Sequence, residues 1–154
     1  MVVSHDASML RGEGPVAGRG PGMTMRGHNI TARTCFVGAC VRMYNATAGG
    51  DHSVVHVAMT ASGTASIRAR VFGVVAGTRI EPQAYGTIVV LGRAATILVT
   101  GAVTVGDFLC MANNLRGAAK TTTTHSGIIF AIASSIKSGS TRGTVTGFIL
   151  PWRM

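Results

Sequence analysis

The sequence predicts an all-β protein, a compact β-barrel or β-sandwich that carries an extended N-terminal arm. Short runs rich in Val, Ile and Thr alternate with Gly- and Ser-containing turns from residue 34 onward. Glycine accounts for 21 of the 154 residues and proline for only 4, so tight turns are frequent. No window of a dozen residues shows a capped helical period. We therefore expect an arm at residues 1–33 and one β domain at residues 34–154.

The first 33 residues differ in composition from the rest of the chain. The stretch from Gly12 to Gly27 contains six glycines and two prolines and has neither a helical nor a strand period. Such a segment buries too little apolar surface to fold alone. It is expected to be either an arm that becomes ordered on a partner or a disordered tail.

The β domain is expected to contain a series of short strands. Alternation is clearest around Arg68 and Arg70, which share one face while Ile67, Ala69 and Val71 share the other. Glycine and asparagine tolerate the backbone angles of tight turns, so they mark the reversals between strands. The predicted strands are Thr34–Met43, Val54–Met59, Ser66–Val75, Thr87–Leu91, Thr96–Thr100, Phe108–Met111, Ile128–Ser134 and Thr144–Leu150. The predicted turns are Ala48–Asp51, Ala76–Thr78, Gly101–Ala102, Asn113–Asn114 and Ser138–Ser140.

Low charge suggests that much of the surface contacts other chains. Charged residues make up 12% of the sequence, against roughly 25% in typical soluble domains, and hydrophobic residues make up 47%. No run of about 18 apolar residues exists that could form a transmembrane helix, and the N-terminus lacks the apolar region of a secretory signal. We expect an oligomer or a larger assembly, with no membrane contact.

The net charge of +9 comes mainly from dispersed arginines. Basic tails that bind nucleic acid usually contain continuous basic runs, and this chain has none. Scattered arginines are more typical of protein interfaces, so nucleic-acid binding is the less favoured alternative. The arginines that we expect to contact a partner are Arg11, Arg19, Arg26, Arg33, Arg68 and Arg70.

No catalytic, metal or cofactor site is expected. The sequence contains only five carboxylates, and none forms a local pair suited to acid–base catalysis. His52 and His56 would lie about 13 Å apart on a strand, too far apart to bind one metal ion. Cys110 and His125 lack an orienting acid, and the odd cysteine count favours free, buried thiols. The chain is therefore expected to be non-enzymatic, without a small-molecule substrate.

The C-terminal half has a recurring pattern of glycines and β-branched residues between Gly77 and Ile149. A Val-Gly-Asp corner at Val105–Asp107 precedes a Gly-Ala turn at Gly117. The strand Gly127–Ala133 follows, and a Gly-Thr-Val-Thr-Gly strand at Gly143–Gly147 closes the unit. This pattern resembles the β module of bacteriophage capsid cement (decoration) proteins.

The resemblance implies a structural protein on the capsid surface of a virion, made in the host cytoplasm. Such a protein would bind the outside of the capsid, bridge neighbouring major capsid proteins and associate with itself as a homotrimer. In this pattern Gly106 permits the corner, Asp107 caps it, and Ala131 and Ala133 allow close sheet packing. The alternatives are a tail or fibre-base module of a phage, or a basic nucleic-acid-binding module.

Overall fold

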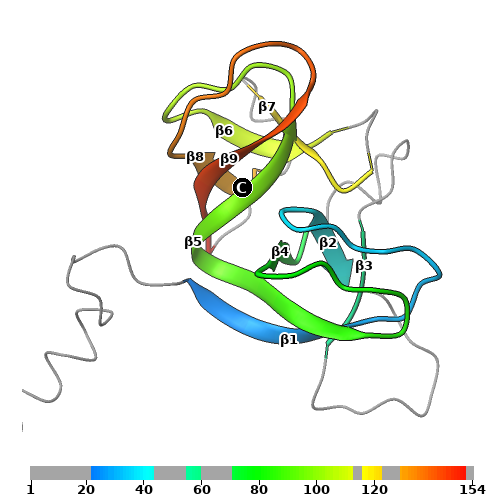
Figure 1. The fold of residues 1–154 in the computed structure, drawn as a ribbon. Helices are drawn as coiled ribbons and strands as arrows, with labels where there is room; N and C mark the ends of the chain where they lie inside the picture. Colours follow the sequence, from blue (N-terminus) through cyan, green and yellow to red (C-terminus); the bar gives the residue numbers. More distant parts are fainter. Residues whose placement is uncertain (1–21, 44–54, 60–70, 113–115, 123–128, 152–154) are drawn as a thin grey trace, which may run out of the picture.

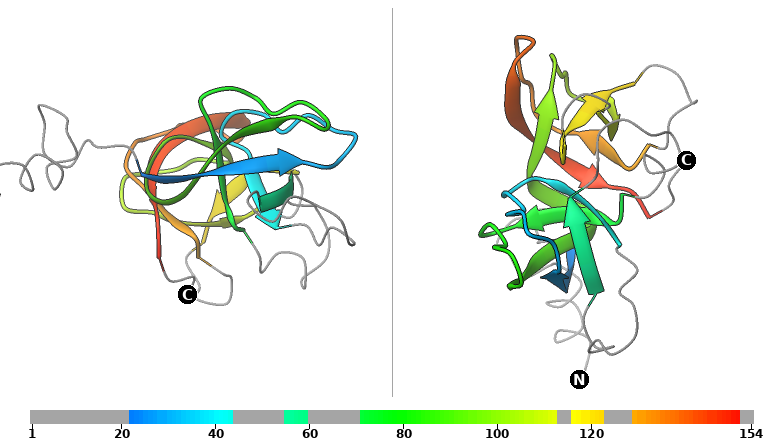
Figure 2. Two further views of the ribbon diagram at one scale, coloured as in Figure 1. Left: turned by 90° about the horizontal axis from the view of Figure 1, so that it is seen from below. Right: turned by 90° about the vertical axis from the view of Figure 1, so that its right-hand side faces the viewer.

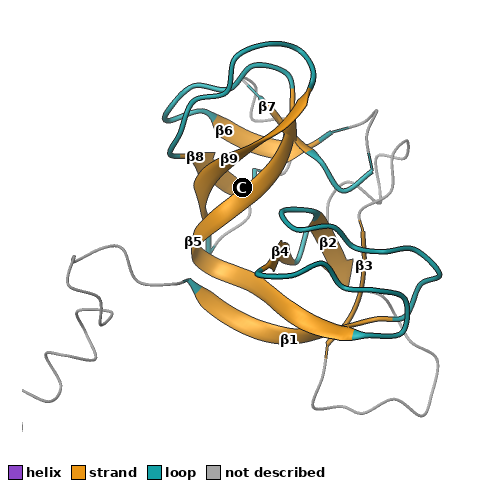
Figure 3. Cartoon of the chain, viewed as in Figure 1, coloured by secondary structure: helices purple, strands orange, loops and turns teal. Residues whose placement is uncertain are grey.

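The computed structural model describes residues 22–43, 55–59, 71–112, 116–122 and 129–151. All regular secondary structure in these ranges is β-strand. Figure 3 shows this all-β character, which confirms the predicted fold class. None of these residues lies in a helix that could cross a membrane. The strands are β1 (Met23–Asn29), β2 (Cys40–Met43), β3 (Val55–Met59), β4 (Gly73–Ala76), β5 (Tyr85–Thr100), β6 (Phe108–Met111), β7 (Ala119–Thr121), β8 (Ala131–Ala133) and β9 (Arg142–Ile149).

Five strands form a closed barrel in the N-terminal part of the chain. The pairing runs β1–β3–β2–β4–β5 and returns from β5 to β1. Only the β1–β3 contact is parallel, and the other four are antiparallel. A closed ring leaves no free edge strand, which a small β protein otherwise has to protect.

The C-terminal strands form a second ring on the same long strand. The pairing runs β5–β7–β6–β8–β9 and returns from β9 to β5, with only the β5–β7 contact parallel. The first half of β5 belongs to one barrel and the second half to the other. Figures 1 and 2 show the two barrels stacked one above the other, with β5 forming part of the wall of both.

The two barrels repeat one topology with the same register. Each runs through five consecutive strand segments, in which the first is parallel to the third and antiparallel to the fifth. Val41 pairs with Met59 in the first barrel as Leu109 pairs with Thr121 in the second. An isolated bridge also recurs, between Cys35 and Ile80 and between Val103 and Lys137. The chain thus contains one structural unit twice, and β5 belongs to both copies.

The turn before β2 joins the barrels through backbone hydrogen bonds. The carbonyl of Gly38 accepts a bond from the Leu98 N–H on β5 (2.8 Å), and the Cys40 N–H donates to the Gly117 carbonyl (2.7 Å). Strand β7 pairs with β5 only at Val99, so this turn fills the seam between β5 and the residues that lead into β7. The first barrel therefore helps to close the second.

Apolar side chains fill both barrels. One buried cluster, which includes Val57, Ile80 and Ile88, lies in the first barrel. A larger cluster, which contains Ile97 and Phe130, fills the second barrel and extends to residues of β2 and β4. The second cluster therefore spans the junction of the barrels, and the pair is held together by apolar packing as well as by backbone bonds.

The boundary of the predicted arm differs from the structure. Residues up to 33 were assigned to an arm, whereas β1 pairs with both β3 and β5 and is part of the first barrel. The composition of this segment did not indicate a strand, because β1 has the sequence MTMRGHN and buries only Gly27 and Asn29 fully. A strand with so few inward-facing apolar residues gives no alternating hydrophobic signal. Residues 1–21 lie outside the described part of the chain.

The predicted strands from Thr87 to Thr100 form one continuous strand. Gly92 has a φ of 81°, and the register with β9 shifts between Ala94 and Ile97. These features bend β5 where it leaves one barrel and enters the other. The predicted turns at Gly77, Gly101 and Gly139 are confirmed by positive φ angles, whereas those at residues 48–51 and 113–114 lie outside the described residues.

The three cysteines are free and buried, as the sequence predicts. Burial raises the pKa of Cys40 to about 12, because the thiolate would be desolvated inside the protein. Burial also raises the pKa of Cys35 and Cys110. Thiolates are the reactive form, so we expect slow alkylation of the native protein at pH 8 and rapid alkylation of all three thiols in denaturant. Mass spectrometry of timed samples measures both rates, and fast native labelling of Cys40 would contradict its burial.

Candidate partner-binding surface

The outer face of the β1–β5 pair carries a basic and aromatic surface. Arg26 and His28 alternate on β1, so both side chains point away from the barrel interior. The register places His28 opposite Tyr85, the first residue of β5. Arg26, His28 and Tyr85 define what is called here the β1 face, whereas Met25, also exposed, alternates to the other side of the strand.

Tyr85 is the centre of this face. Its ring stacks on the His28 ring, with centroids 4.4 Å apart and planes inclined by 11°. The guanidinium carbon of Arg26 lies 4.5 Å from the Tyr85 ring centroid, a cation–π distance. Beside them is an open hollow of about 390 Å³, lined by Thr24, Met25, Arg26, Tyr85, Gly86 and Thr87.

Arg26 is available for a partner's carboxylate. Two of the five carboxylates of the chain lie among the described residues, and both are engaged elsewhere. Glu81 binds Thr34 and Arg79, and Asp107 accepts a hydrogen bond from the Thr104 N–H (2.8 Å). The Asp107 contact confirms the predicted cap of the Gly106 corner. In the described part of the chain, no carboxylate is left to neutralise Arg26.

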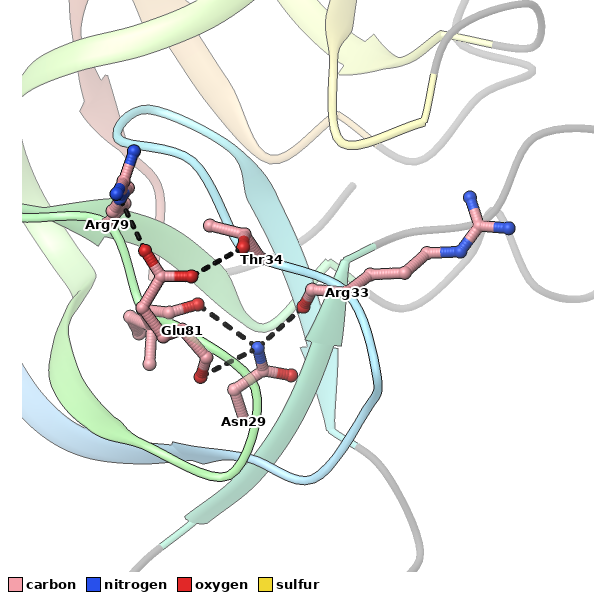
Figure 4. A network of polar contacts seen from close by, with 6 residues as sticks. Asn29, Arg33, Thr34, Arg79 and Glu81 are labelled. Carbon is pink, nitrogen blue, oxygen red and sulfur yellow. Dashed lines mark hydrogen bonds and ion pairs between the residues drawn. The ribbon is translucent and has the colours of Figure 1, made fainter.

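A buried polar network holds the end of β1 against the start of β5. Asn29 is fully buried, and its side-chain amide donates to the carbonyls of Arg33 (2.7 Å), Ile80 (3.1 Å) and Glu81 (3.2 Å). Its side-chain oxygen accepts bonds from the N–H and hydroxyl of Thr31. Figure 4 shows how these contacts tie the loop after β1 to the loop before β5.

The same network fixes Tyr85 and His28. Gln83 has a φ of 60°, and its N–H donates to the Asn29 carbonyl (2.8 Å). The His28 ring nitrogen lies 3.2 Å from the Gln83 carbonyl. The positions of the aromatic and basic side chains of the β1 face therefore depend on an amide buried beneath them.

Glu81 gives this network a dependence on pH. The hydrogen bond from Thr34 lowers the pKa of the carboxyl, and Arg79 lowers it further. A carboxyl with a lowered pKa in the folded state stabilises the protein above its unfolded pKa, about 4.3. That contribution is lost as the pH falls through the folded pKa. We expect the melting temperature of the wild type to fall more than that of Glu81→Gln when the pH is lowered below 5. An equal fall of the melting temperature in both proteins would contradict this.

The predicted partner-contact arginines divide into three groups. Arg26 lies on the β1 face, and Arg33 lies in the following loop, with its side chain directed away from Asn29 in Figure 4. Tyr85 and Met25 were missed because an isolated tyrosine and a methionine in a glycine-rich stretch give no sequence signal. Arg11, Arg19, Arg68 and Arg70 lie outside the described residues.

The other predicted chemistry is only partly covered by the structure. Asp51, His52 and His125 lie outside the described residues. Among the residues that the structure describes, no three His, Cys, Asp or Glu side chains form a group that could bind a metal ion. Cys110 is buried and its pKa is raised, which is the opposite of what a nucleophilic thiol requires.

Comparison with known proteins finds a distant structural neighbour among solved structures. No protein-family model matches the chain, and no curated protein matches it. Among solved structures, the head fiber gp8.5 N base in bacteriophage phi29 superposes with a TM-score of 0.53 at 14% sequence identity. The match covers 86% of this chain and 98% of that one, so the two have a similar fold.

Proposed function

We propose that this chain is a structural protein of a phage particle that binds the outside of the capsid and bridges neighbouring major capsid proteins. The observation that carries the proposal is the tandem-barrel fold, which the chain shares with a phage head fiber base along 86% of its length. The low charge of the chain supports it, because a surface poor in charge suits burial against other proteins.

The β1 face supports a protein partner with an acidic surface. Arg26 offers a planar, permanently charged group suited to carboxylates, and the Tyr85 ring offers apolar area beside it. Two basic side chains already contact the Tyr85 ring, so a stacked nucleic-acid base would have to displace one of them. The geometry therefore favours a protein partner over nucleic acid.

A binding assay on capsids tests this proposal. Purified heads that lack the protein should bind it until their sites are saturated, and bound heads should disrupt at a higher temperature. Arg26→Ser should weaken binding and reduce its salt dependence, because an exposed charge acts through screened attraction. Arg116→Ser, which removes an exposed arginine from the second barrel, is the matched control. Heads that bind none of the protein would overturn the proposal.

A second candidate function is the base of a fibre or a tail module. It is favoured by the same neighbour, which is itself a fiber base. Imaging of particles separates the candidates: density spread over the capsid lattice supports bridging, whereas density beneath fibres or on the tail supports the base. Duplex binding that falls steeply with salt, without binding to heads, would instead support the nucleic-acid alternative.

A further inference from the structure

Three residues that face outward from the first barrel are buried against the second barrel. Cys40, Val74 and Val89 are cross-strand partners on β2, β4 and β5. The adjacent residues Val41 and Val75 face the core of the first barrel, so the three partners point away from it. All three are at most 5% exposed and belong to the apolar cluster that fills the second barrel. This row is therefore the surface on which the second barrel packs.

The second barrel has an equivalent row on its own outer side. Phe108, Ile132 and Phe148 are cross-strand partners on β6, β8 and β9. In the register that the two barrels share, Leu109 of β6 corresponds to Val41 of β2, and each row begins one residue before it. These three residues, called here the apolar row, are therefore the counterpart of the buried row in the first barrel.

The apolar row is partly open to solvent. Phe148 is 44% exposed, and Phe108 and Ile132 are half-buried. Arg93 of β5 is the next cross-strand partner of Phe148, so it extends the row by one strand. The row thus presents two aromatic side chains at a position where the first barrel has a covered surface.

Residues 1–21 join the described part of the chain at one end of this row. The Gly22 N–H donates to the Arg93 carbonyl (3.2 Å), and Arg93 pairs with Phe148 on β9. Figure 1 shows the start of β1 at the bend of β5. Because Gly22 and Phe148 both neighbour Arg93, their backbones are at most two strand spacings apart, about 10 Å. The N-terminal segment therefore begins beside the apolar row.

The segment has the composition and the length to cover the row. Pro15–Ala17 is an apolar stretch between two glycines, and Val16 lies six residues before Gly22. Six extended residues span up to about 20 Å, which is enough to reach any member of the row. Proline-containing segments dock on aromatic surfaces at low entropic cost, because they are already extended. We propose that Pro15–Ala17 packs on the apolar row of the same chain.

This contact would give the second barrel the cover that the first barrel receives from its neighbour. The segment buries too little apolar surface to fold alone, but a preformed row supplies the missing contacts. Its attachment at Gly22 keeps Pro15–Ala17 at a high effective concentration near Phe148, so a modest contact area is sufficient for docking.

Intramolecular cross-linking of the full chain tests the proposal. An Ala17→Cys, Ile132→Cys protein should form a disulfide within one chain under mild oxidation, with Val16, Phe108 and Phe148 left in place. The matched control pairs Ala17→Cys with Met23→Cys, because Met23 is 61% exposed and lies next to Gly22. A tethered but undocked segment would reach Met23 more readily than Ile132. Docking should reverse this order and make the Ile132 pair link at least about tenfold faster.

Thermal unfolding of point variants of the full chain gives a second test. Val16→Asp should lower the melting temperature by about 2–4 °C, since it places a charge on the apolar row. That fall should disappear in a Phe148→Ser background and persist in a Phe36→Ser background. Phe36 is the matched control, because it is 45% exposed and lies in the first barrel.

Three results would overturn the inference. They are faster linking of the Met23 pair, disulfides that form only between chains, and a Val16→Asp effect that is absent or equal in the two phenylalanine backgrounds. Neither test involves phage heads, so the inference stands or falls separately from the proposed function.

Discussion

Replacing Asn29 by aspartate is expected to destabilise the protein by about 3–5 kcal/mol at pH 7, the range for a buried polar network with an uncompensated charge. The side chain is fully buried, and its amide donates to three carbonyl oxygens. Aspartate has nearly the same shape but can only accept hydrogen bonds when it is ionised. Its carboxylate would face the carbonyls of Arg33, Ile80 and Glu81 with no donor between them.

The pH dependence of stability shows whether the loss in this variant comes from the charge of the new side chain or from its shape. Burial and the three facing carbonyl oxygens should raise the pKa of the new carboxyl in the folded state above its unfolded value, about 3.9, and the two donors of Thr31 offset only part of this effect. The Asn29→Asp protein should then be closest to the wild type below pH 4 and should lose stability as the pH rises through that raised pKa. Urea unfolding at several pH values measures both effects.

Gln83→Glu is the matched control. This amide donates to the Ile30 carbonyl (3.1 Å) in the same network, but the residue is exposed. Water can solvate the new carboxylate, so a loss of about 1 kcal/mol or less is expected. Equal losses of unfolding free energy in the two variants would show that the burial of Asn29 adds nothing to the cost of the new carboxylate.

The fold class followed from the sequence because its signals are local. Turns at Gly77, Gly101 and Gly139 need positive φ angles, and glycine marks such positions whatever the tertiary structure. The closure of two rings around β5 could not be predicted in this way. It depends on pairs such as Val99 with Ala119 and Asn29 with Val57, which are set by long-range packing.

The candidate surface was only partly predictable for a related reason. Arg26 was singled out by its charge, but its importance comes from Tyr85, 59 residues later in the chain, which the β1–β5 pairing brings within 4.5 Å. The structural repeat of the two barrels could not be predicted from the sequence either. The corresponding turns share only the Val-Gly pair at residues 37–38 and 105–106, and their equivalence lies in backbone hydrogen bonds.

The turn at Gly38, which bonds to β5, and the equivalent turn at Gly106 of the second barrel allow the contact between the barrels to be measured within one chain. Gly38→Ala and Gly106→Ala introduce the same methyl group at the same kind of positive-φ position, which costs about 1–2 kcal/mol for an L-residue.

At Gly106 that cost should be the whole effect, because a Cβ there meets no described atom within 4 Å. At Gly38 the methyl group would lie 2.9 Å from the Thr96 side chain and 3.0 Å from the Leu98 nitrogen. Either the turn shifts and loses its bond to β5, or β5 bends away from it. A total loss of about 3–4 kcal/mol is therefore expected for Gly38→Ala, since the displaced bond and packing add to the backbone strain. Denaturant unfolding of the two variants measures the difference. Equal destabilisation would mean that the seam between the barrels is closed by the apolar core alone.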